Sequence, residues 1–87
     1  MAVFLRLLST DHCSLCDEAL TALFSMPDIA GLELRVVDVA DDDKLLETYG
    51  ERVPVLQLFA GAPEPSLALE LNWPFDADSV GVALRKL

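Results

Sequence analysis

Apolar side chains recur along this sequence with two different periods, and the two periods predict a mixed α/β chain. Short apolar or alternating runs are typical of strands, which we expect at residues 3–8, 32–39, 53–59 and 67–71. After the first run the spacing becomes helical. One helix face is predicted to consist of Leu15, Ala19, Leu23 and Met26. Pro27 is expected to end this helix.

Capping residues predict two more helices. Asp41 or Asp42 can cap a short helix, and Gly50 suits the left-handed position at the end of that helix. Asp76 can cap a closing helix. The side chains of the short helix that are expected to face inward are Leu45, Leu46 and Tyr49.

The resulting order of elements is β-α-β-α-β-β-α. Strands separated by helices should be parallel and joined by right-handed crossovers, and the last two strands should form an antiparallel hairpin. We therefore expect one domain, residues 1–87, of α/β class. Its mixed four-stranded sheet should carry helices on both faces.

The cysteine content changes this picture most. The chain has two cysteines, three positions apart, and a bridge between them would close too short a loop to add much stability. With 53% hydrophobic residues, the core must hold the fold. In a reducing compartment such a pair is typical of catalytic, redox-sensing or metal-binding sites.

The charge balance excludes several partners. Six Lys and Arg stand against fifteen Asp and Glu, which gives a net charge of −9. Such a domain repels nucleic-acid backbones and anionic membrane surfaces. No apolar stretch approaches the ~20 residues of a membrane span, and the N-terminal residues carry no recognisable leader. We expect a cytoplasmic protein that binds neither nucleic acid nor membrane.

The motif that carries chemistry is Cys13-Ser14-Leu15-Cys16, at the junction of the first strand and the first helix. A helix N-terminus stabilises a thiolate, so Cys13 is expected to attack a disulfide and Cys16 to resolve the mixed disulfide. His12 is a candidate for modulating Cys13, although a solvent-facing loop residue is the simpler interpretation. The competing interpretation of the pair is two ordinary buried cysteines.

The element order, the Cys-x-x-Cys position and Val53-Pro54 at the start of the third strand together resemble the thioredoxin superfamily. Within it the chain is most similar to short glutaredoxin-like proteins. The resemblance implies a thioredoxin-like fold and a thiol-disulfide oxidoreductase. It also implies that Pro54 is cis and that the Val53 backbone contacts the substrate. Arg52 is a further candidate for substrate binding, with a solvated surface cation as the alternative.

The sequence departs from glutaredoxins at three places. Asp11 and His12 stand ahead of the first cysteine, where a basic residue is common in that family. Arg52 stands where glutaredoxins usually have Thr, and residues 72–76 replace their Gly-Gly turn and the Asp that follows. These departures argue against glutathione as co-substrate while leaving it open. No resident cofactor or metal is expected, and the partners expected for a monomer are protein or small-molecule disulfides. Trp73 is expected to pack at the strand–helix corner.

Two other functions stay open at this point. A thioredoxin-fold binding or redox-sensing module would keep the cysteines without turnover. A metal carrier would use His12, Cys13 and Cys16, but a structural zinc site requires four ligands and the chain has no other Cys or His. An iron–sulfur carrier would resemble those glutaredoxins that hold a cluster between two chains with added glutathione.

Overall fold

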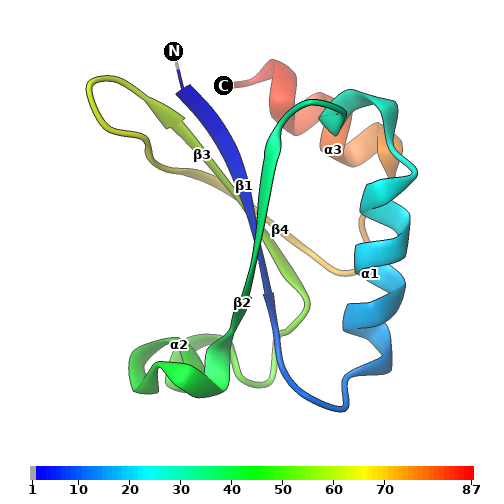
Figure 1. The fold of residues 1–87 in the computed structure, drawn as a ribbon, viewed down its shortest axis with the longest axis vertical. Coiled ribbons are helices and arrows are strands. Elements are labelled where there is room, and N and C mark those ends of the chain that lie inside the picture. The colour runs from blue at the N-terminus through cyan, green and yellow to red at the C-terminus, as the bar shows by residue number, and fades with distance from the viewer. Residues whose placement is uncertain (1) are drawn as a thin grey trace.

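A twisted sheet with strand order β2-β1-β3-β4 organises the protein (Figure 1). The computed structural model describes residues 2–87. The strands are β1 (Ala2–Ser9), β2 (Glu33–Asp38), β3 (Val55–Gly61) and β4 (Ser66–Asn72). The helices are α1 (Ser14–Phe24), α2 (Asp43–Tyr49) and α3 (Ala77–Arg85), with 3₁₀ turns at Pro27–Ile29 and Val39–Asp41. This is the predicted element order, and α1 ends before Pro27.

Strand directions agree with the prediction in two pairs and differ in one. β1 is parallel to β2, and β3 forms the expected antiparallel hairpin with β4. β3 is antiparallel to β1, so the prediction that strands separated by helices are parallel is wrong for β3. The seven residues of α2 span only about 10 Å, too little to return along a ~20 Å strand. The chain therefore re-enters the sheet at the end where β2 left it.

Two apolar clusters lie on opposite faces of the sheet. The larger one packs β1 and β3 against α1 and α3, and the fully buried strand residues in it are Leu5, Leu7, Leu56 and Leu58. The smaller cluster consists of Leu8, Val39 and Val55, with Leu45, Tyr49 and Val53 packed on it. Figure 1 shows α1 and α3 on one side and α2 at one end of the other. Helices on both faces are therefore confirmed.

The inward face of α1 begins one residue later than predicted. Leu15 is 47% exposed, whereas Cys16 is 4% exposed and joins Ala19 and Leu23 in the interior. The prediction for Leu15 is wrong because the buried face of α1 starts at a cysteine and not at the first large hydrophobic side chain. Cys16 has the same three- and four-residue relation to the next buried positions, and cysteine behaves as a small hydrophobe.

The helix α2 is capped as predicted at its start and differs at its end. The carboxylate of Asp42 accepts hydrogen bonds from the N–H groups of Lys44 and Leu45. Leu46 is 46% exposed, so its predicted inward position is wrong. Gly50 has φ −53° and is not left-handed. A Cβ there would lie 2.5 Å from the Leu46 carbonyl oxygen, so close backbone approach explains this glycine.

The helix α3 begins where Asp76 predicted it would. The Asp76 carboxylate accepts from the Ser79 N–H at 2.8 Å, and the Ser79 hydroxyl accepts from the Asp76 N–H at 2.9 Å. These bonds form a capping box, and the backbone bond lowers the pKa of Asp76. No helix within residues 2–87 has the length and apolar character needed to cross a membrane.

The larger cluster should dominate the stability of the fold. We expect Leu58→Ala on β3 to lower the free energy of unfolding by about 2–5 kcal/mol, because it leaves a cavity among fully buried side chains. The matched control is Leu67→Ala on neighbouring β4, where the leucine is 45% exposed and the change should cost less than about 1 kcal/mol. Urea unfolding measures both. Equal losses would contradict this description of the core.

Candidate functional site

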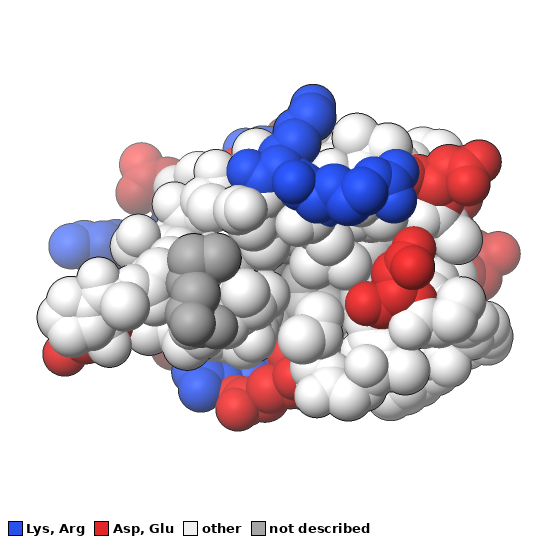
Figure 2. Space-filling view, turned by 90° about the horizontal axis from the view of Figure 1, so that it is seen from above, with Lys and Arg blue, Asp and Glu red and all other residues white. Residues whose placement is uncertain are grey.

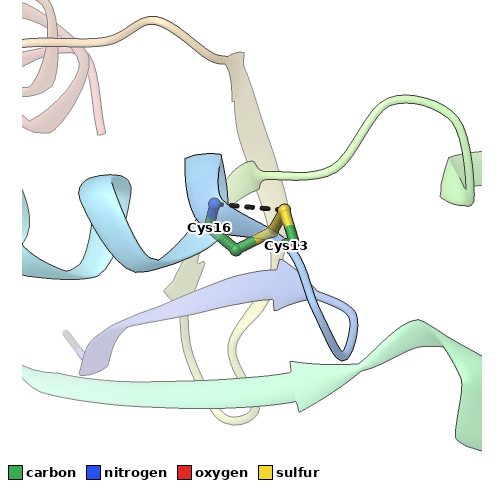
Figure 3. The surroundings of a disulfide bond; sticks show 2 residues. All are labelled: Cys13 and Cys16. Carbon is green, nitrogen blue, oxygen red and sulfur yellow. Dashed lines mark hydrogen bonds between the residues drawn. A yellow bond between two sulfur atoms is a disulfide. The ribbon is translucent and has the colours of Figure 1, made fainter.

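The sulfur of Cys13 caps the first helix. Cys13 is the N-cap residue of α1, with φ −105° and ψ 101°, and its Sγ accepts a hydrogen bond from the Cys16 N–H at 3.1 Å (Figure 3). Helix N-caps usually place a side-chain oxygen at this point. The sulfur of Cys13 therefore lies where the free N–H groups and the helix dipole favour negative charge. A helix N-terminus generally favours the thiolate form of a cysteine placed there.

The two cysteines differ in access. They are joined by a disulfide, with their Cα atoms 5.2 Å apart. Cys16 is 4% exposed and lies in the interior of the sheet–helix layer, whereas Cys13 is partly exposed at the helix tip. An approaching molecule can therefore reach the sulfur of Cys13 and not that of Cys16. The difference in access between Cys13 and Cys16 agrees with the sequence analysis, and the attacking and resolving roles stay predictions.

The loop between β1 and α1 carries polar residues around the motif. Asp11 and His12 are exposed, and so is Asp17 in the first turn of α1. His12 has φ +59°, a left-handed conformation that is uncommon outside glycine. Within residues 2–87, its side chain forms no hydrogen bond. The predicted influence of His12 on Cys13 stays a prediction.

The Val53-Pro54 segment lies at the same end of the sheet as the cysteines. Leu8, near the end of β1, is opposite Val55, the first residue of β3. The loop that leaves β1 and the loop that enters β3 therefore emerge together (Figure 1). Figure 3 shows the segment entering β3 passing close to the disulfide. The Val53-Pro54 peptide bond is cis and Pro54 is fully buried, which confirms the predicted isomer.

The backbone of Val53 has one group in use. Its N–H donates to the Tyr49 carbonyl at 3.1 Å, and its side chain packs on the smaller cluster. Its carbonyl accepts no hydrogen bond from any described residue. Of the two backbone groups of Val53, only the carbonyl is therefore open to a partner. The prediction that the Val53 backbone binds substrate then applies to its carbonyl alone.

The side chain of Arg52 contacts two residues of β4. Its guanidinium donates to Asn72 Oδ1 at 3.1 Å, lies 3.9 Å from Glu70 Oε1 and stacks 5.0 Å from the centre of the Tyr49 ring. Sequence reasoning missed these partners. The available signal was Gln57, a polar residue inside an apolar strand, which lies opposite Glu70 in the register of β3 and β4.

A groove runs beside α1 near the motif. It encloses about 510 Å³ and is lined by Asp17, Glu18, Thr21, Ala22, Ser25 and Trp73. Trp73 packs against the larger cluster and meets the Phe75 ring edge-on at 5.1 Å, which confirms the predicted packing role. The two carboxylates give the groove acidic character.

The opposite end of the molecule has a different surface. Figure 2 shows that most of it is uncharged, with a group of Lys and Arg side chains along one edge. Within residues 2–87, no three His, Cys, Asp or Glu side chains are grouped so as to hold a metal ion.

The two sulfurs should differ in reactivity once the protein is reduced. At neutral pH we expect iodoacetamide to modify Cys13 at least about tenfold faster than Cys16, because Cys13 is both accessible and next to the helix N-terminus. Mass spectrometry of peptides after short exposure measures the two rates. Faster modification of Cys16 would reverse the assignment of roles.

Comparison with known proteins identifies the family of this chain and solved structures of similar fold. Residues 4–85 match the family described as glutaredoxin-like domain (DUF836). The crystal structure of XcR50, a structural genomics target protein from X. campestris, is 36% identical over 95% of this chain and 97% of that one, with a TM-score of 0.69. The solution structure of XcR50 is 37% identical over 100% of this chain and 96% of that one, with a TM-score of 0.66. None of the curated proteins compared with the chain matches it.

Two thioredoxins have the same fold at lower identity. Thioredoxin-2, a component of the malaria parasite protein secretion machinery, is 13% identical over 99% of this chain and 84% of that one, with a TM-score of 0.72. A thioredoxin from Thermus thermophilus is 16% identical over 98% of this chain and 72% of that one, with a TM-score of 0.67. The thioredoxin-like fold predicted from the sequence is confirmed.

Proposed function

The chain belongs to the glutaredoxin-like family of the thioredoxin superfamily, and from that premise we propose that it is a thiol-disulfide oxidoreductase. One observation carries the proposal: the Cys13 sulfur caps α1 and is joined to a buried Cys16. A sulfur in this position is activated as a nucleophile and is also held as a good leaving group. Both properties are required for rapid exchange in two directions.

The proposed reaction starts from the reduced pair. The Cys13 thiolate attacks one sulfur of a partner disulfide; that S–S bond breaks, and the departing thiolate takes a proton from water. Cys16 then gives its proton to water and attacks the Cys13 sulfur. The mixed disulfide breaks, the partner leaves with two thiols, and the Cys13–Cys16 disulfide forms. An external dithiol, or two monothiols, returns the two electrons.

The Val53-Pro54 segment is the proposed docking point for the partner chain. The free carbonyl of Val53 can accept one backbone hydrogen bond, while buried Pro54 presents no N–H that would need a partner. Arg52 supplies positive charge nearby, although Glu70 and Asn72 already engage its guanidinium. We therefore assign Val53 the larger part in substrate binding.

The electrostatics of the site favour protein disulfides over glutathione. Glutathione has a net negative charge at neutral pH, whereas Asp11, Asp17 and Glu18 flank the motif in a chain of net charge −9. Like charges slow encounter and weaken binding. The proposed partners are protein or uncharged small-molecule disulfides, in the cytoplasm, where thiols are kept reduced.

Turnover tests the proposal. Wild type should reduce a mixed disulfide of a small thiol, and Cys13→Ser should abolish that activity. The exposed-site variant Leu67→Ala, at the far end of β4, is the matched control and should retain it. Donor systems based on thioredoxin reductase and on glutathione are compared, with glutathione expected to be the weaker. Absence of turnover with both donors would contradict the proposed function.

The resolving role of Cys16 needs a separate variant. Cys16→Ser should leave the attack by Cys13 intact and stop the second step, so mixed disulfides with partner proteins accumulate. Non-reducing electrophoresis and mass spectrometry detect them. If Cys16→Ser and Cys13→Ser both trap nothing, the order of attack proposed above is wrong.

A further inference from the structure

A polar network crosses the face of the sheet that carries the smaller cluster. Gln57 on β3 is 1% exposed, and its Nε2 donates to Glu70 Oε2 at 2.8 Å and to the Tyr49 hydroxyl at 3.3 Å. The Tyr49 hydroxyl in turn donates to the same Glu70 oxygen. Arg6 donates to Gln57 Oε1 at 2.7 Å, which fixes the orientation of the amide. Two strands thus hold the ring of the last residue of α2.

Tyr49 connects this network to the Val53-Pro54 segment. Its backbone carbonyl accepts hydrogen bonds from the N–H groups of Arg52, at 2.8 Å, and Val53, at 3.1 Å. The Arg52 guanidinium covers the Tyr49 ring and reaches the second oxygen of Glu70. Both oxygens of Glu70 are therefore engaged with residues that shape this segment.

The pKa shifts of Glu70 and Tyr49 agree with a hydrogen bond from the Tyr49 hydroxyl to the Glu70 carboxylate. Burial raises the pKa of Glu70, but hydrogen bonds from Tyr49 and Gln57 lower it. The charges of Arg52 and Arg6 add to the lowering, so the pKa of Glu70 lies below its ordinary value of 4.5. The bond to Glu70 raises the pKa of Tyr49, which keeps the hydroxyl protonated as a donor. Glu70 is therefore an ionised acceptor at neutral pH.

We propose that Glu70 is a positioning residue that acts through Tyr49 to hold the Val53 carbonyl where a partner chain meets Cys13. This inference rests on the proposed function and deepens it. Binding geometry at the reacting sulfur depends on the segment, and displacement of about 1 Å can cost up to about 100-fold in rate. The intrinsic reactivity of Cys13 comes from α1 and does not involve Glu70.

The test compares three substitutions. Glu70→Gln removes the negative charge of the carboxylate, and Tyr49→Phe removes the hydroxyl that donates a hydrogen bond to Glu70. The matched control is Glu33→Gln, which removes the same charge from the same sheet face at the start of β2, where Glu33 pairs with Arg35. Each variant is assayed for kcat/KM with a peptide disulfide and for alkylation of reduced Cys13 by iodoacetamide.

We expect Glu70→Gln and Tyr49→Phe to lower kcat/KM by about tenfold or more, mainly through a higher KM, while alkylation of Cys13 stays unchanged. Glu70→Gln weakens the hydrogen bond between Tyr49 and Glu70, and Tyr49→Phe removes it, so the double variant should lose less than the sum of the two single losses. Glu33→Gln should match wild type. A kcat/KM for Glu70→Gln equal to that of Glu33→Gln would overturn the inference, as would a parallel loss of alkylation.

Amide hydrogen exchange separates this inference from the proposed function. The N–H groups of Arg52 and Val53 should exchange faster in Glu70→Gln than in Glu33→Gln, whether or not the protein turns over. Faster exchange with an inactive wild type would overturn the proposed function and leave the attachment of the segment in place. Unchanged exchange would overturn the inference by itself.

Acid should have the same effect as the substitution. Because folding lowers the pKa of Glu70, its contribution to stability is complete above the ordinary value of 4.5 and is lost as the pH falls through the lower folded value. The difference in unfolding free energy between wild type and Glu70→Gln should therefore be constant near neutral pH and shrink in acid. Urea unfolding over a pH series measures it. A difference that grows in acid would contradict the assignment.

Discussion

The central strand β1 is the constraint on which the other elements depend. It pairs parallel with β2 on one side and antiparallel with β3 on the other, and its buried leucines contribute to both apolar clusters. Its end at Ser9 determines where the loop to α1 begins, and its pairing with β3 brings Pro54 to the same edge. Residues that are about forty positions apart in sequence therefore meet at one site.

The proposed function uses two parts of the structure, the N-terminus of α1 and the segment that enters β3. The N-terminus of α1 provides the chemistry, because its free N–H groups meet the Cys13 sulfur and its interior side covers Cys16. The segment entering β3 is the docking point in the proposed function, and it is attached to α2 and β4 by side chains that do not touch the cysteines. The proposed function therefore attributes reactivity and substrate geometry to separate sets of contacts.

The sequence was sufficient for the features that follow from local patterns. The element order, the cap at Asp76 and the position of Cys13 at a helix start depend on neighbours within a few residues, and the structure confirms them. The direction of β3 depends on the length of α2 relative to the sheet, which periodicity does not measure. Glu70 and its partners belong to elements that only the strand register brings together, so the sequence left this network unseen.

The proposed function depends most directly on a redox-active Cys13–Cys16 bond. Its reduction potential is measured by equilibrating the protein in buffers of defined thiol–disulfide ratio and counting free thiols by alkylation, with Cys13→Ser as control. We expect a value of about −270 to −200 mV, the interval between thioredoxin and the glutaredoxins. A value below about −300 mV, typical of structural disulfides, would contradict it.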